Sequence, residues 1–276
     1  MAGTFTGERA EVLITVKASP EPSEAHGDTV CVAGIRLDLY PHRWIRLYPV
    51  PFRWMSADHQ FGKFEAISVN LLRPQNDNRH ESFRIDGESV ERSNRRVGTG
   101  PARGAILEPL VGPSMCDLID AVHDDPAAQS LGLVRVRELR DVFIKPHPGW
   151  SVAQQRKIDQ AQAQMLFGDP PPPLVAPAYL LGFKYFCERA SCRGHEQRNL
   201  DWEATVLQLH VRKMSPQAQM EAIRKRYRDE RCGPDKALHF FVGNMAHPTK
   251  RRSFSVLGTY GPPKQSRYAD TLDLGV

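Results

Sequence analysis

The N-terminal third of the chain consists of short apolar runs separated by turn residues. The runs are rich in β-branched residues or alternate between apolar and polar positions, a pattern that is typical of strands. We expect strands at 11–17, 29–36, 43–48, 61–72 and 80–85. Pro49 and Pro51 are expected to end the third strand, because proline donates no hydrogen bond to a sheet. Five short strands at close spacing predict a small barrel or sandwich.

The third predicted strand has an aromatic and basic face. Side chains alternate along a strand, so Trp44, Arg46 and Tyr48 share one face, while Ile45 and Leu47 share the other. Aromatic rings stack on unpaired bases and basic groups meet phosphates, as in oligonucleotide-binding barrels. The alternatives are that the aromatic face is the core, or that both faces are covered. With two nearby basic residues added, the candidate nucleic-acid surface consists of Trp44, Arg46, Tyr48, Arg53 and Lys63.

Two further basic stretches could contact a phosphate backbone. The stretch 92–103 is polar, basic and glycine-bearing, and we expect it to be a mobile loop that carries Arg95 and Arg96. The second stretch is the run 250–252 in a predicted turn. A solvated charge run without a partner is the alternative for both.

The rest of the chain mixes helices and strands. Helices are predicted to start at Ser114, Ser151 and Ser215, each followed by residues that suit a first helical turn. Strands are predicted at 131–144, 237–244 and 253–260. We place a boundary between an N-terminal barrel at 1–105 and a second region at 106–276, for which one alternative is a second, divergent barrel interrupted by the Cys/His insert.

Thiol and imidazole groups gather in the stretch 183–203, FKYFCERASCRGHEQRNLDWE. Cys187, Cys192 and His195 fall within nine positions after a short aromatic strand. These groups are ligands that Zn²⁺ prefers, and the polar neighbours make unligated cysteines a liability. The alternative is two structural thiols beside a surface histidine. We predict a zinc-binding insert over about 183–235, on the ligand preferences of that ion.

The fourth ligand is missing from this motif. Cys232 is the first candidate because thiolate-rich sites are usually structural, and the alternatives are His210, His239 and His247. Four protein ligands would indicate a structural metal site, whereas a water as the fourth ligand would be compatible with a catalytic site.

The triplet Asp201, Trp202 and Glu203 admits two interpretations. Its carboxylates could serve a second metal or acid–base chemistry. The favoured interpretation is a helix start, because acidic side chains near a helix N-terminus stabilise the helix dipole.

Composition narrows the class of protein. The 276 residues carry a net charge of +5, from 37 basic and 32 acidic side chains, so a nucleic-acid partner is permitted and not required. Five cysteines are an odd and sparse set, which indicates a reducing compartment. No apolar run is long enough to cross a bilayer and the first residues lack a signal-peptide pattern, so we expect a cytoplasmic protein. Familiar nucleotide-binding and hydrolase motifs do not occur.

Three segments together resemble a known family. They are VLITVKASPEPS to WIRLYPVPFR near the start, the Cys/His stretch, and HFFVGNMAHP to FSVLGTYGPP near the end. In this order they resemble bacterial proteins with a dual OB-fold domain. The resemblance implies a β-rich α+β fold with two OB-like small barrels, helical insertions and a zinc-binding-type insert. It also implies nucleic-acid binding and an association with bacterial defence genes.

The first functional hypothesis is therefore a protein that binds nucleic acid, with single-stranded DNA or RNA favoured, and that carries a structural Zn²⁺ site. Protein partners from the same operon are a further expectation. The second hypothesis is a metal-dependent hydrolase, a nuclease or deaminase-like enzyme, with Glu203 or Asp201 as base. The spacing of zinc deaminases is absent, which disfavours that reading. A third hypothesis is a protein–protein adaptor.

Overall fold

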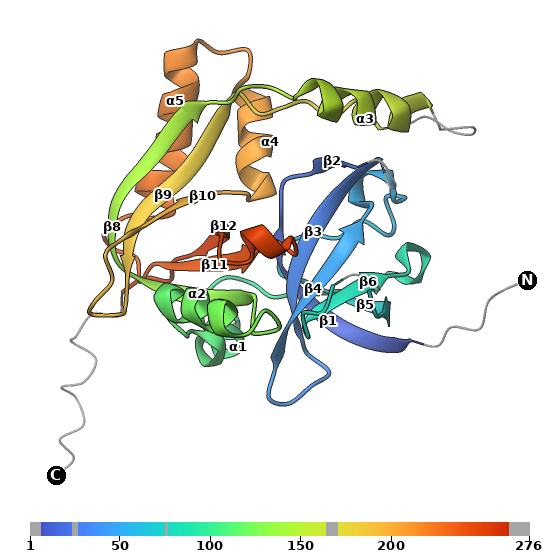
Figure 1. Cartoon of the computed structure of the whole chain (residues 1–276), viewed down its shortest axis with the longest axis horizontal. Helices are drawn as coiled ribbons and strands as arrows, with labels where there is room; N and C mark the ends of the chain where they lie inside the picture. Colours follow the sequence, from blue (N-terminus) through green and yellow to red (C-terminus); the bar gives the residue numbers. More distant parts are fainter. Residues whose placement is uncertain (1–6, 24–26, 75–76, 164–170, 265–276) are drawn as a thin grey trace, which may run out of the picture.

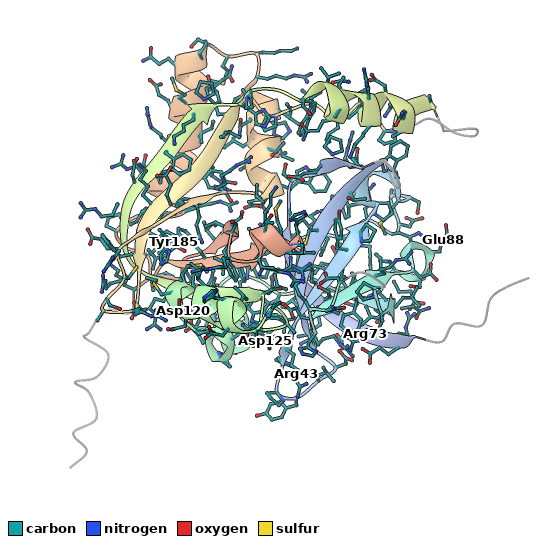
Figure 2. The ribbon with its side chains drawn as sticks, viewed as in Figure 1. Arg43, Arg73, Glu88, Asp120, Asp125 and Tyr185 are labelled. Carbon is teal, nitrogen blue, oxygen red and sulfur yellow. The ribbon has the colours of Figure 1, made fainter. Side chains whose placement is uncertain are left out.

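The computed structural model describes residues 7–23, 27–74, 77–163 and 171–264. Two sheet units lie side by side, the first built from the N-terminal strands and the second from the C-terminal strands. Helices lie around the second unit, and one helix, Val152–Ala163, packs against the first (Figure 1). The charged side chains of Arg43 and Glu88 are exposed at the molecular surface (Figure 2).

The first unit contains a closed five-stranded barrel. Its strands are β1 (Glu8–Lys17), β3 (Gly27–Arg36), β4 (Arg43–Val50), β5 (Glu65–Leu72) and β6 (Ser82–Ile85). They pair in the order β1-β3-β4-β6-β5, and β5 pairs back to β1, which closes the ring. The β4–β6 pair is parallel and the others are antiparallel. Two short strands extend the sheet: β2 (Glu21–Ser23) and β7 (Glu91–Arg96).

The second unit is a five-stranded sheet whose two edges meet. Its strands are β8 (Leu131–Pro146), β9 (Tyr179–Cys187), β10 (His195–Arg198), β11 (His239–Asn244) and β12 (Phe254–Tyr260). They pair antiparallel in the order β10-β9-β8-β11-β12. Just after β10, Asn199 forms a parallel bridge with Val256 of β12. The Leu200 amide also donates to the Val256 carbonyl at 2.8 Å, so the outer strands contact each other.

The helices begin where the sequence supplies caps. They are α1 (Pro101–Leu107), α2 (Met115–Asp124), α3 (Val152–Ala163), α4 (Trp202–Val211) and α5 (Pro216–Arg224). Ser114 and Asp117 form a capping box at α2, and Ser215 caps α5 ahead of Pro216. A π-helical segment, Lys225–Glu230, continues α5. Single 3₁₀ turns lie at Phe52–Trp54, Gly87–Ser89, Glu108–Leu110 and Pro248–Lys250.

The two units share a buried core at their junction. Leu13 and Ile35 of the first unit pack in one cluster with Leu133 and Leu257 of the second. Trp44 reaches from β4 to Phe241 of β11, and their ring centres are 6.2 Å apart in an edge arrangement. The outer face of β4 is therefore partly covered by the second unit.

The fold confirms the expectation of a β-rich protein with a small five-stranded barrel and helical insertions. Ile45 and Leu47 lie inside the barrel, so the alternative in which Trp44 and Tyr48 form the core face is wrong. Strand β4 continues past Pro49, so the expected end at Pro49 is wrong, but the strand does end at Val50, immediately before Pro51. Val30 and Val32 of β3 pair with Val50 and Leu47, so β4 has one extra residue here, and the resulting bulge contains Pro49.

The stretch 92–103, expected to be a mobile loop, contains strand β7 and the start of a helix. β7 pairs with β5, and the Ser93 hydroxyl donates to the Ala66 carbonyl at 2.9 Å. Helix α1 begins at Pro101, a residue suited to a first helical position. β7 is an edge strand with exposed charged side chains, so it lacks the apolar alternation that marks buried strands.

Close packing between β9 and its neighbours gives a first testable prediction. A Cβ atom on Gly182 would lie 2.5 Å from the Gln197 carbonyl oxygen and 2.1 Å from the Phe143 ring. We expect Gly182→Ala to lower the free energy of unfolding by about 2 kcal/mol, because the backbone must move. Gly98→Ala is the control, since nothing lies within 4 Å of the added atom. Urea unfolding curves measure both, and equal midpoints would contradict the prediction.

Candidate metal centre and nucleic-acid interface

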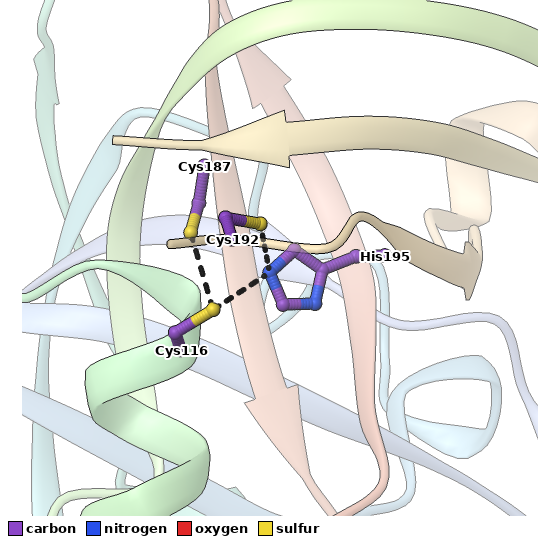
Figure 3. A group of neighbouring side chains, drawn as sticks. All are labelled: Cys116, Cys187, Cys192 and His195. Atoms are coloured by element: carbon purple, nitrogen blue, oxygen red, sulfur yellow. Dashed lines mark hydrogen bonds between the residues drawn. The ribbon is translucent and has the colours of Figure 1, made fainter. Parts of the chain in front are cut away.

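Four metal-ligating side chains converge on one point of the second unit. They are Cys116, Cys187, Cys192 and His195, and their donor atoms all lie within 4.8 Å of one another (Figure 3). Cys116 comes from α2, Cys187 from the end of β9, and His195 from the start of β10. This group, named here the Cys₃His cluster, could hold a metal ion.

The spacing of the donors suits a tetrahedral site. The Cys116 sulfur lies 3.6 Å from that of Cys187 and 3.5 Å from His195 Nε2, and Cys192 lies 3.4 Å from the same nitrogen. A tetrahedral zinc ion with bonds of about 2.3 Å to sulfur and about 2.0 Å to nitrogen separates its ligand atoms by roughly 3.5–3.8 Å. The chemistry of the cluster and these three spacings therefore fit a zinc ion.

A tight turn brings three of the donors together. β9 and β10 are antiparallel, with His195 opposite Tyr185, so the strand ends present Cys187 and His195 on adjacent strands. The Cys192 amide donates to the Arg189 carbonyl at 3.0 Å, and Gly194 has a φ of 101°. Only glycine adopts this left-handed conformation easily, and it reverses the chain between Cys192 and His195.

The fourth donor is fixed by the capped start of a helix. The capping box of α2 sets the first helical turn, and Cys116 lies in that turn. Arg189, in the turn after β9, pairs with Asp117 and also with Asp120, its Nη1 lying 2.6 Å from the Asp120 carboxylate. These contacts hold the helix against the turn that carries Cys192.

The electrostatics of Cys116 and Cys187 favour a nearby cation. Burial opposes ionisation of Cys187, but hydrogen bonds from the Cys116 backbone and His195 lower the pKa of its thiol to about 6. Burial and the neighbouring Cys187 raise the pKa of Cys116 to about 12. Without a counter-ion, one thiolate thus disfavours the next, and a bound divalent cation would remove this conflict.

Cys232, the expected fourth ligand, lies outside the Cys₃His cluster, and Cys116 stands in its place. Cys232 is buried in the core of the second unit, and burial raises its pKa to about 12. The adjacent Arg231 pairs with Asp201 and Glu203, which holds this end of the helical segment beside the start of α4.

The three alternative histidines also lie elsewhere. His239 Nδ1 lies 2.9 Å from the Ala237 carbonyl oxygen, and His247 Nδ1 lies 2.9 Å from the Thr249 hydroxyl. His210 is in the last turn of α4. Sequence reasoning missed Cys116 because 71 residues separate it from Cys187. The sequence offered one clue: Cys116 follows the predicted helix-capping serine Ser114, which places Cys116 in the first turn of a helix.

The acidic triplet forms a helix start, as favoured from the sequence. Asp201 caps α4, and its side chain accepts from the Glu203 amide at 3.2 Å. Neither carboxylate belongs to the Cys₃His cluster. Lys63 Nζ lies 2.9 Å from Asp201 Oδ1, so this predicted nucleic-acid contact instead joins the two units by an ion pair.

The remaining predicted nucleic-acid residues occupy different settings. Arg46 is 3% exposed and Tyr48 is 47% exposed. Arg53 pairs with Asp28. Arg95 and Arg96 are exposed at the end of β7, away from the outer face of β4 in the strand order, and Arg95 lies 3.9 Å from a Glu11 carboxylate oxygen.

A cavity of about 360 Å³ lies where the outer face of the barrel meets the second unit. From the first unit it is lined by Arg46, Tyr48 and Arg79 among others, and from the second by the end of β11 and the turn that follows it. Lys250, in one of the two predicted basic stretches, also lines it. This cavity, named here the junction groove, gathers part of the predicted surface and adds Arg79, which sequence reasoning missed.

No helix in the described ranges is long and apolar enough to cross a membrane. Comparison with curated proteins gives no match. Among solved structures, a similar chain is entitled "Structure of murine DNA binding protein bound with ds DNA"; it is 8% identical, with 94% of this chain and 100% of that chain covered. The TM-score of 0.30 is too low to support an argument about fold or function.

Two protein-family models match consecutive parts of the sequence. The model described as Domain of unknown function (DUF8758) matches residues 8–109. The model described as Domain of unknown function (DUF8757) matches residues 111–273, which is more than half of the chain. The chain therefore belongs to the DUF8757 family.

Proposed function

We propose that this protein binds single-stranded nucleic acid in the junction groove and that a zinc ion in the Cys₃His cluster stabilises the second unit. Three lines of argument support the proposal: the topology of the two units, the state of Arg46, and the exposure of Tyr48 beside it.

The strand order supports two OB-like barrels. In the first barrel, the strands numbered along the chain run 1-2-3-5-4 and back to 1, with the third and fifth parallel. The second unit follows the same cyclic order, and its parallel bridge between Asn199 and Val256 again joins the third and fifth strands. Five-stranded Greek-key barrels of the OB type bind oligonucleotides on the face of strands 2 and 3, which here are β3 and β4.

The observation that carries the proposal is the environment of Arg46. Its Nη2 donates to the Ser130 carbonyl and hydroxyl, both at 3.0 Å, and its Nη1 lies 3.3 Å from the Cys31 sulfur. Its Nε has no hydrogen-bond partner among the described residues. The nearby Glu81 carboxylate accepts from the Ser130 amide, so it is linked to Arg46 only indirectly, by way of Ser130. A buried guanidinium without a direct carboxylate partner is unfavourable, and a phosphate oxygen would supply the missing acceptor.

Tyr48 supplies the second element of the site. It lines the same groove as Arg46 and is 47% exposed, which leaves part of its side-chain surface accessible to a base. Stacking of this kind requires an unpaired base, which is why single-stranded nucleic acid is the favoured partner. Lys250 and His247 add donors at the second wall of the groove.

The Cys₃His cluster is proposed as a structural site. Four protein donors complete a tetrahedral zinc, which leaves no position for an activated water. Asp201 and Glu203, the candidate bases of a hydrolase, are held in ion pairs with Lys63 and Arg231. These features favour the binding function over a metal-dependent hydrolase.

The test of the proposed function compares two tyrosines. Tyr48→Ala should weaken the binding of a fluorescein-labelled single-stranded oligonucleotide by about 5- to 150-fold, since one base–aromatic stack is worth about 1–3 kcal/mol. Tyr40→Ala is the matched control, because Tyr40 is 98% exposed and does not line the groove. Fluorescence anisotropy at two salt concentrations measures both affinities. Equal affinities of the two variants, or no salt-dependent binding by the wild type, would contradict the proposal.

A further inference from the structure

A second cavity, of about 640 Å³, lies at the junction beside the start of α4. The first unit contributes Lys17 and Lys63 to its wall, and the second contributes Asp201, Glu203, Arg226 and Arg231. This cavity, named here the α4 cavity, has the volume of a small-molecule site. It shares no lining residue with the junction groove.

The charges in the α4 cavity do not cancel. Lys63 Nζ lies 2.9 Å from Asp201 and 3.7 Å from Glu203, and Arg231 pairs with the same two carboxylates. Two cations and two anions thus satisfy one another. Lys17 is left over, because its ammonium donates to the Phe61 carbonyl at 2.9 Å and forms no ion pair with a described residue.

The surroundings of Lys17 strengthen the case for a missing anion. Its Nζ lies 4.2 Å from the centre of the Phe52 ring and 5.4 Å from that of Trp202, so aromatic surface replaces part of its water. Arg226 adds a second cation at the exposed edge, where its partner Glu230 forms only a surface pair. An anion that enters between these groups would meet a partly desolvated positive site.

An unpaired donor lines the same cavity. Tyr227 is 1% exposed, and its hydroxyl has no hydrogen-bond partner among the described residues. Buried hydroxyl groups are almost always paired, so this one calls for an acceptor. Trp202 and the half-exposed Val206 give the cavity an apolar side next to its cationic side.

We propose that the α4 cavity binds a phosphomonoester of nucleotide size, with the phosphate held by Lys17 and Arg226 and the organic part against Trp202 and Val206. A dianionic phosphate with several acceptor oxygens matches two cations and a free hydroxyl better than a single carboxylate does. The site goes beyond the proposed function and does not depend on it, since the α4 cavity and the junction groove have separate walls.

The acid–base state of Lys17 gives the site a pH dependence. Burial and the neighbouring Lys63 lower the pKa of Lys17 to about 8, against the opposing effect of Glu203, Glu65 and Asp201. His210, Arg226 and Arg231 also face the cavity. The ammonium is present below pH 8 and lost above it, whereas a phosphomonoester stays dianionic above its second pKa of about 6. Affinity should therefore fall as the pH rises from 7.5 to 9.

Calorimetric titration of the full chain with AMP, inorganic phosphate and adenosine tests the proposal. We expect AMP to bind at least about tenfold more tightly than adenosine, which lacks the phosphate. Lys17→Met keeps the length of the side chain and removes its charge; it should weaken AMP binding by about tenfold or more and abolish the pH dependence. Arg226→Gln, at an exposed position, should weaken binding by a smaller factor. Arg228→Gln is the control, since Arg228 is exposed on the same segment and does not line the cavity.

The outcomes separate the possibilities. A 5′-phosphorylated oligonucleotide that outcompetes its 5′-hydroxyl counterpart only in the wild type identifies a strand end as the source of the phosphate, whereas competition by AMP alone identifies a free nucleotide. Unchanged AMP affinity in both Lys17→Met and Arg226→Gln overturns the proposal, as does a folded wild type that binds neither AMP nor inorganic phosphate. Tyr48→Ala should keep its AMP affinity and Lys17→Met its affinity for 5′-hydroxyl strands, so failure of one site is distinguishable from failure of the other.

Discussion

Cys116→Ser is expected to remove most of the bound zinc and to lower the free energy of unfolding by about 3 kcal/mol or more, a large part of the 5–15 kcal/mol of a typical domain. A serine oxygen is a poor zinc ligand, and the three remaining donors would leave α2 without its link to the β9–β10 turn. The zinc content of the purified protein, measured by elemental analysis, should fall from about one ion per chain to a small fraction of that value.

Cys232→Ser is the matched control for the metal centre. Cys232 is also buried but lies outside the Cys₃His cluster, so the variant should keep its zinc. If Cys232→Ser loses the metal and Cys116→Ser retains it, the cluster is assigned to the wrong residues. A wild type that contains no metal after purification without chelators, and takes up none when zinc is added, would contradict the structural site itself.

Asp201→Ala is expected to lower the free energy of unfolding by about 4 kcal/mol, because it removes a buried carboxylate that pairs with two partly buried cations, leaves those cations only Glu203, and removes a helix cap. Asp201 is 1% exposed, and its carboxylate meets Lys63 of the first unit and Arg231 of the second. It also accepts from the Glu203 amide at the start of α4. One side chain thus ties together both units and one helix.

The measurement is urea unfolding of Asp201→Ala beside Asp235→Ala. Asp235 is an exposed acid that pairs only with its neighbour Lys236 in the described structure, so its removal should leave the midpoint unchanged. Asp201→Asn keeps an acceptor for the helix start and should fall between the wild type and Asp201→Ala. Similar midpoints for Asp201→Ala and Asp235→Ala would show that the ion pairs at the junction contribute little.

Local patterns in the sequence were sufficient for most strands and helix starts. The alternation in 43–48 correctly divided the strand into two faces, because burial on one face imposes a period of two, but it left open which face is the core; in the structure Ile45 and Leu47 face the barrel interior. Capping serines located α2 and α5, because their hydroxyls pair with the free amides of the first turn.

Features that depend on long-range contact could not be read in this way. Arg46 is buried because it contacts Ser130, which lies 84 residues away in the sequence. Cys116 joins the Cys₃His cluster because α2 packs against the β9–β10 turn. Strand β7 was missed because its pairing uses the backbone of β5 while its charged side chains stay in solvent. These contacts join residues that are far apart in the sequence, so local sequence patterns do not predict them.

The distance along the chain between the metal ligands has a consequence for how the protein is made. Cys116 leaves the ribosome 79 residues before His195, whereas every strand of the first barrel precedes both. N-terminal segments tend to fold first during translation, so the first barrel can form while the ligands of the later unit are still incomplete. If the proposed zinc ion binds, its supply would then affect only the folding of the second unit, and a nascent chain that lacks the ion would have a folded first barrel and an incomplete second unit.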